Sequence, residues 1–130
     1  MNHKRSTLKI LISLIIYACS SRMIHNVEKD ENGKVILKEI VNKCDGSLTR
    51  IKYNSDGKKM IESKIRDSTI LSTKIFNEEG QLVGENKTFE HLKSGVIVAS
   101  RRDGTVGYIT IGRTDSDDSL ASRFSHIINN

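Results

Sequence analysis

The stretch that decides the fold is YNSDGKKMIESKIRDSTILSTKIFNEEG, residues 53–80. Two turn sequences, NSDG at 54–57 and NEEG at 77–80, enclose two runs of strand composition at 58–66 and 69–76. An Asp or Asn two or three residues ahead of a glycine suits a type I turn that a left-handed glycine closes. The stretch therefore predicts consecutive antiparallel hairpins.

The same rhythm continues on both sides of this stretch. Further turn signals lie at 30–33, 44–46 and 102–104, and the chain contains no proline. The remaining runs of strand composition are 34–41, 48–53, 81–89, 95–100 and 105–111. Short runs of strand composition separated by turns predict a mostly β fold, an antiparallel meander of about six to seven strands.

Alternation of apolar and polar residues within these runs is weak. One face of 58–65 holds Lys58, Met60, Glu62 and Lys64, so it lacks the apolar stripe that packing onto a core requires. We therefore expect a sheet that is partly a single layer, solvated on much of both faces. The most apolar runs, 95–99 and 106–111, are the expected core.

The end of the chain has a different pattern. After the acidic residues 115–118, apolar residues fall at helical spacing and predict an amphipathic helix over 117–129 that covers the apolar end of the sheet. Asp115, Ser116 or Asp117 can cap its N-terminus. The acidic cluster could instead hold Ca²⁺, but it lacks the spacing and terminal Glu of an EF-hand loop. The helical stripe consists of Leu120, Phe124, Ile127 and Ile128.

The beginning of the chain predicts a signal peptide over 1–18. Lys4, Arg5 and Lys9 precede a short apolar segment at 10–18. Nine helical residues span about 14 Å, less than half the hydrocarbon core of a bilayer. The segment is therefore too short for a stable transmembrane anchor.

The four residues 16–19, IYAC, resemble the bacterial lipobox. In lipoproteins of that type the cysteine thiol receives diacylglycerol and the cysteine becomes the new N-terminus, which implies lipid attachment at Cys19. We expect 19–27 to form the lipidated cysteine and its tether, and 28–130 to form a single β-meander domain. The alternatives are an ordinary signal peptide cut after Ala18 or elsewhere, and an uncleaved anchor.

The hairpin sequences also resemble those of the spirochaetal, Lyme-type outer-surface lipoprotein A family. The resemblance lies in YNSDGKKMIESK at 53–64 and STKIFNEEGQLV at 72–83, with RRDGT at 101–105 similar to a later turn of that family. It implies an extended antiparallel sheet, tethering through Cys19, and contact with host or vector surfaces. The rhythm is also similar to the tyrosine-aspartate repeats of secreted bacterial β-rich proteins.

Charge and motif content exclude several classes of function. The net charge is +5, of which Lys4, Arg5 and Lys9 in the leader supply three, so the remaining basic residues do not indicate nucleic-acid binding. The four histidines show no spacing typical of metal ligands, and no phosphate-binding loop or nucleophile motif occurs. We therefore expect no enzyme activity, no metal or cofactor, and no small-molecule substrate.

Two smaller features leave alternatives open. Arg101, Arg102 and Arg113 form a candidate anion patch for glycosaminoglycan or anionic lipid, and the alternative is a strand edge protected by charge. Cys44 lies in a turn, either as an unreactive thiol or as one that forms an intermolecular disulfide or acts as a nucleophile.

The sequence thus favours a non-enzymatic lipoprotein anchored at the bacterial outer membrane or cell surface. Its partners would be the membrane, through the N-terminal lipid, and a host or environmental macromolecule bound by the exposed sheet. The alternative is a periplasm-facing lipoprotein with a structural or assembly role, which binds an envelope protein by strand addition.

Overall fold

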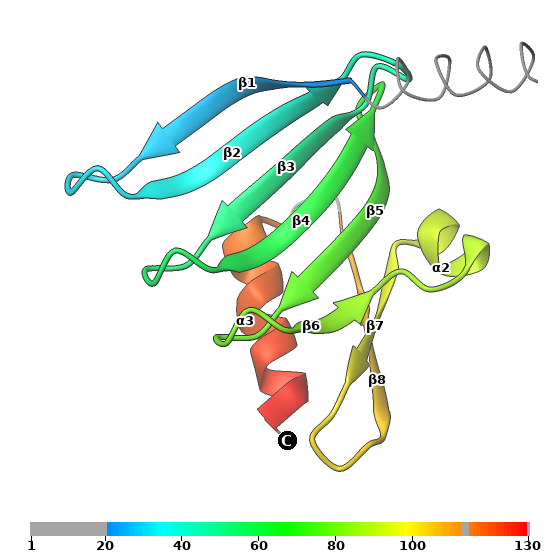
Figure 1. Cartoon of the computed structure of the whole chain (residues 1–130). Coiled ribbons are helices and arrows are strands. Elements are labelled where there is room, and N and C mark those ends of the chain that lie inside the picture. The colour runs from blue at the N-terminus through cyan, green and yellow to red at the C-terminus, as the bar shows by residue number, and fades with distance from the viewer. Residues whose placement is uncertain (1–20, 113–114, 130) are drawn as a thin grey trace, which may run out of the picture.

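The computed structural model describes residues 21–112 and 115–129. They form one antiparallel sheet of eight strands whose order in space is their order in the chain, with a helix behind it (Figure 1). This confirms the expected mostly β meander with a C-terminal helix, with eight strands in place of six or seven. The elements are β1 (Arg22–Lys29), β2 (Val35–Asn42), β3 (Leu48–Tyr53), β4 (Lys59–Arg66), β5 (Thr69–Phe76), β6 (Leu82–Glu85), α2 (Phe89–Ser94), β7 (Val96–Ser100), β8 (Val106–Thr110) and α3 (Asp117–Asn129).

The turns follow the glycine signals of the sequence. Gly57 and Gly80, which close the connections on either side of β4 and β5, have φ of 79° and 81°. Each is preceded by an Asn whose side chain accepts backbone N–H groups across the turn, as Asn54 Oδ1 does from Asp56 and Lys58. The connection between β4 and β5 has no glycine, and both of its residues, Asp67 and Ser68, adopt positive φ.

Strand β1 occupies residues that we expected to form the tether. The polar composition of 19–27 predicts a tether, yet Arg22–Lys29 pairs with β2, with a register shift between Ile24 and Asn26. That prediction was wrong for residues 22–27. A strand at the edge of a sheet tolerates polar side chains on both faces, because the backbone ladder to β2 supplies its hydrogen bonds. Residues 22–29 therefore belong to the sheet.

The expected strand at 81–89 is shorter in the structure. It ends at Glu85, and Thr88 caps α2 by accepting the His91 N–H at 3.1 Å. Where β6 ends, the side chain of Asn86 joins the neighbouring strands. Its Oδ1 accepts the Thr73 N–H of β5 at 2.8 Å, and its Nδ2 donates to the Val96 carbonyl of β7. The Asn86 side chain thus connects β5 to β7 by hydrogen bonds beyond the point where β6 ends.

The core lies between α3 and one row of cross-strand neighbours. In register, Ile61 of β4 faces Ile75 of β5, which faces Gly84 of β6, then Ala99 of β7 and Gly107 of β8. All five residues are buried. The expected contribution of β7 and β8 is correct, but β4 and β5 each add an isoleucine despite their weak alternation. The buried hydrophobic cluster comprises Ile61, Ile75, Ile97, Ala99, Ile109, Leu120 and Phe124.

Two glycines in this row let α3 approach the sheet closely. A Cβ atom on Gly84 would lie 2.1 Å from Cζ of Phe124, and one on Gly107 would lie 2.5 Å from Cγ2 of Ile127. Both distances are far below van der Waals contact. The helix therefore packs its largest side chains directly onto bare strand backbone. Ser116 begins the helix by accepting the Ser119 N–H at 3.1 Å, and Lys52 of β3 binds Asp118 at 2.8 Å.

The Gly84→Ala substitution tests this packing. Overpacking a filled core costs about 1–3 kcal/mol of unfolding free energy, so we expect a loss of that order in urea denaturation. Phe124→Leu removes the clashing end of the ring and serves as the matched second change. The double variant should lose less stability than the sum of the two single losses. Strict additivity would contradict a direct clash.

Candidate functional site

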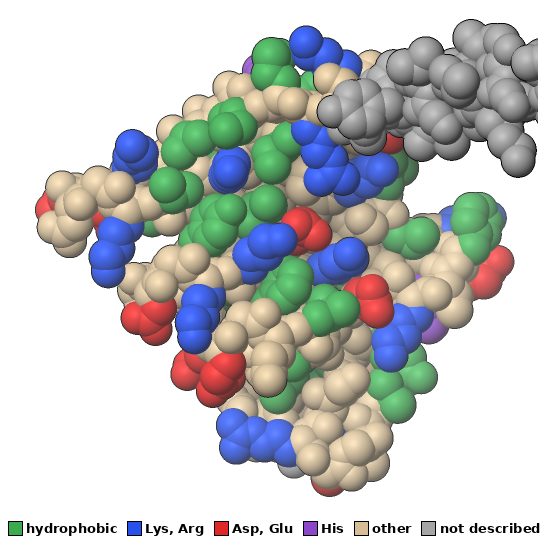
Figure 2. All heavy atoms as spheres, in the orientation of Figure 1, with side chains coloured by type: hydrophobic (Ala, Val, Ile, Leu, Met, Phe, Trp, Pro, Cys, Tyr) green, Lys and Arg blue, Asp and Glu red, His purple; other side chains and the backbone are tan. Residues whose placement is uncertain are grey.

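The surface most suited to binding is the side of the sheet turned away from α3, which we call the open face. Figure 2 shows this face, with basic and acidic side chains placed among hydrophobic ones. One row of cross-strand neighbours crosses all eight strands on it, since each member is paired in register with the next. From β1 to β8 the row is Val27, Lys38, Ile51, Glu62, Lys74, Glu85, Val98 and Tyr108.

Charges alternate in sign along the middle of this row. Lys74 lies between Glu62 and Glu85, and Lys59 Nζ binds Glu62 Oε1 at 3.2 Å. Opposite charges on neighbouring strands stabilise a sheet by roughly 0.2–1 kcal/mol a pair. They also keep the two carboxylates apart. This row therefore offers paired charges and apolar contacts to a partner surface rather than two adjacent carboxylates for acid–base chemistry.

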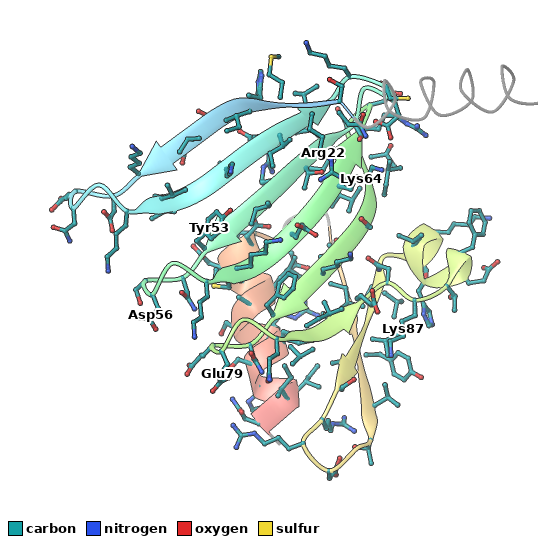
Figure 3. All side chains as sticks on the ribbon, viewed as in Figure 1. Arg22, Tyr53, Asp56, Lys64, Glu79 and Lys87 are labelled. Carbon is teal, nitrogen blue, oxygen red and sulfur yellow. The ribbon has the colours of Figure 1, made fainter. Side chains whose placement is uncertain are left out.

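A shallow cleft opens between the tips of two hairpins. It has a volume of about 390 Å³ and lies at the end of the sheet where the β1–β2 and β3–β4 connections meet. Lys34 Nζ donates to the Ser55 carbonyl at 3.1 Å and joins the two hairpins beside it. Figure 3 shows Tyr53 and Asp56 at this end. The cleft is lined by Lys34, Val35, Lys38, Tyr53, Asp56 and Gly57.

The two edges of the sheet differ in how they are covered. On β8, Arg101 Nη1 donates to the Val106 carbonyl and Arg123 Nη2 to the Thr110 carbonyl, both at 3.3 Å. These arginines occupy acceptors that an added strand would need. Arg123 is held in place by Asp115, whose Oδ2 lies 2.9 Å from its Nη1.

The opposite edge has no such cover within the described residues. Among residues 21–112 and 115–129, no arginine or lysine donates to a β1 carbonyl as Arg101 and Arg123 do on β8. Three apolar side chains of β1 are exposed, namely Met23, Ile24 and Val27. A register shift between Ile24 and Asn26 interrupts the strand. This irregularity shortens the stretch of β1 that an added strand could pair with, but it does not prevent such pairing. The open edge of the sheet is therefore β1.

The structure describes two of the three arginines of the candidate anion patch, Arg101 and Arg102. Arg101 bonds the Thr105 hydroxyl at 3.3 Å as well as the Val106 carbonyl, so its guanidinium lies along β8. Asp103 in the same turn carries a negative charge beside it, because the Thr105 side chain and N–H and the charge of Arg101 hold the pKa of that carboxyl below its usual value. Arg102 is exposed, and Arg113 lies outside the described residues. The alternative, a strand edge protected by charge, fits Arg101.

The other singled-out residues are placed as follows. Cys19 lies outside the described residues, and Cys44 is exposed in the β2–β3 connection. Within the described ranges no three His, Cys, Asp or Glu side chains come together as metal ligands could. None of the described helices has the length and apolar character needed to cross a bilayer. The residues that sequence reasoning missed are Arg123 and Asn86, since only the folded chain brings them to β8 and β7.

Asp45 organises the β2–β3 connection at the end of the sheet where β1 begins. The Ser47 N–H donates to Asp45 Oδ1 at 2.9 Å, and Lys64 Nζ lies 3.4 Å from Oδ2. The Ser47 side chain, its backbone N–H and the Lys64 ammonium together lower the pKa of Asp45 to about 2 from the usual 3.8. The ionised carboxylate thus links this connection to β4.

No protein-family model, curated protein or solved structure matches this chain. The resemblance to outer-surface lipoproteins therefore stays a prediction from the hairpin and lipobox sequences.

Removal of the arginines that cover β8 should open that edge. We expect Arg101→Ser combined with Arg123→Ser to form larger species than the wild type in analytical ultracentrifugation, because the freed carbonyls can accept an added strand. Arg102→Ser is the control, since this neighbouring arginine is exposed and contacts no β8 carbonyl in the described structure. An unchanged size distribution in the double variant would show that the arginines do not protect the edge.

The lowered pKa of Asp45 predicts a specific acid response. A carboxyl whose pKa falls on folding stabilises the fold above its unfolded pKa, near 3.8, and loses that contribution as pH falls toward about 2. Asp45→Asn keeps the acceptor for Ser47 but has no charge to lose. Its unfolding free energy should therefore fall less steeply than that of the wild type between about pH 4 and 2, measured by urea titration. Parallel slopes would rule out this role for the carboxylate.

Proposed function

We propose that this protein is a non-enzymatic lipoprotein, anchored through Cys19 at the bacterial outer membrane or cell surface, that binds a host or environmental macromolecule through its open face. The observation that supports binding is that α3 does not cover this face of the sheet. α3 packs on the opposite side, and Ile24, Val27 and Tyr108 stay 58, 38 and 62% exposed on the open side.

The chemistry of the open face favours a macromolecular partner over a small substrate. Its charged residues are spread across the strands in alternating sign, and its cleft is shallow rather than enclosed. Small-molecule sites are concave and bury most of their ligand, whereas protein surfaces pair charges around apolar contacts over a wide area. Tyr53 at the cleft and Tyr108 in β8 are the aromatic side chains that would anchor such a partner.

The anchor is supported by the sequence alone. The basic leader, the short apolar segment and the IYAC sequence at 16–19 precede β1 directly. In this proposal the thiol of Cys19 receives the diacylglycerol. Several acyl chains, at about 0.8 kcal/mol for each buried CH₂, would hold the protein on the membrane permanently.

A second candidate is favoured by the contrast between the two edges. A periplasm-facing lipoprotein could bind an envelope protein by strand addition, and β1 is the edge that the described residues leave uncovered, while Arg101 and Arg123 bond carbonyls of β8. Crosslinking in cells separates the two candidates. Capture of an envelope protein through β1 supports this second role, and capture of an extracellular ligand through the open face supports the first.

Detergent phase partition with protease treatment of intact cells tests the anchor and its location. We expect the wild type in the detergent phase, cleaved on whole cells, and Cys19→Ala in the aqueous phase. Cys44→Ala is the matched control and should partition as the wild type does. Wild-type protein in the aqueous phase would overturn the lipid anchor, and detergent partition with full protection from protease would favour the periplasmic role.

A further inference from the structure

The start of β1 brings the sheet close to the proposed lipid. Only Ser20 and Ser21 separate Cys19 from Arg22, the first residue of β1. Three extended residues reach at most about 11 Å. The Ser21 carbonyl accepts the Lys43 N–H at 3.2 Å, which ties this point to the β2–β3 connection. A lipid on Cys19 would therefore hold this end of the sheet at the headgroup layer.

This end, which we call the Arg22 end, consists of 21–22, the β2–β3 connection at 43–47, and 64–69 around the β4–β5 turn. Figure 3 shows Arg22 and Lys64 there, on neighbouring parts of the sheet. Basic side chains outnumber acidic ones in these segments, although Lys64 and Asp45 form an ion pair. The basic residues are Arg22, Lys43, Lys64 and Arg66, and the acidic residues are Asp45 and Asp67.

The opposite end has the opposite balance. Its three turns, at 30–33, 54–57 and 77–80, contain acidic residues and no Lys or Arg. Lys29, Lys34 and Lys58 flank these turns and leave the end net negative. Figure 3 shows Asp56 and Glu79 at this far end. The acidic residues of the turns are Asp30, Glu31, Asp56, Glu78 and Glu79.

The geometry and the charges together point to an orientation. We propose that the protein stands upright on an anionic lipid surface, with the Arg22 end against the headgroups and the far end directed away. The proposal rests on the proposed lipid anchor at Cys19. An anionic surface attracts basic residues within about a Debye length of it and repels the acidic turns. A strand of eight residues is about 26 Å long, so the cleft near Tyr53 would face outward.

The chain contains no tryptophan, so a single introduced tryptophan reports its own position. Thr69→Trp places it at the Arg22 end and Ser55→Trp at the far end, and both replace exposed neutral residues. The lipidated protein is purified from cells and reconstituted into vesicles of phosphatidylcholine and phosphatidylglycerol that carry a headgroup nitroxide quencher. Circular dichroism checks that each variant keeps the sheet.

We expect Thr69→Trp to lose most of its emission to the headgroup quencher and Ser55→Trp to lose little, with the opposite order for aqueous iodide. Lys43→Gln combined with Arg66→Gln should reduce the contrast between the two reporters in vesicles that contain phosphatidylglycerol. Equal quenching of the two reporters in detergent-partitioning protein would overturn the orientation alone. Protein that does not partition into detergent would overturn the orientation and the anchor together.

Discussion

The packing of α3 onto bare strand backbone is the contact on which the rest of the structure depends. The buried apolar cluster on the core side of the sheet is built from β4, β5, β7 and β8, with no residue from β1–β3. Gly84 and Gly107 remove the side chains that would keep the helix away, so Phe124 and Ile127 bury their surfaces against the backbone and against Ile61, Ile75 and Ala99. This second layer stabilises the meander, because an uncovered sheet of this composition buries too little apolar surface. The first three strands extend from this packed part, held by the backbone ladder and by pairs such as Asn26 with Glu39 at 3.1 Å.

The elements that sequence analysis predicted well are those whose cause is local. Gly57 and Gly80 need left-handed backbone, so they mark turns, and the runs between them have strand composition. The apolar stripe of 120–128 predicts α3 for the same reason. β1 could not be predicted in this way, because its polar residues become a strand only through pairing with β2. The hairpin that carries Arg101 was predicted, but the hydrogen bond of its guanidinium to the Val106 carbonyl depends on side-chain conformation, and the gap that Asn86 fills exists only between folded strands.

The open face, the candidate binding surface, exists because α3 covers only the opposite side of the sheet. Because α3 takes one face, the other keeps its charges and aromatic residues for contact with solvent and partners. The row from Val27 to Tyr108 is paired in register across every strand, with Ile51 and Val98 buried within it and His91 of α2 beside Tyr108. The two ends of the strands differ in charge, and the two edges differ in cover. Face, end and edge thus provide three separate surfaces on a small domain, and each can contact a different neighbour.

The contrast between the edges also limits how copies of this chain can associate. A sheet with two uncovered edges can add strands without end, which is how fibrils of stacked strands grow. Within residues 21–112 and 115–129, two arginines bond carbonyls of β8, and no arginine or lysine does so on β1. Two copies that joined through their β1 strands would leave the β8 strands at the two outer edges. Growth by strand pairing would then stop at two chains.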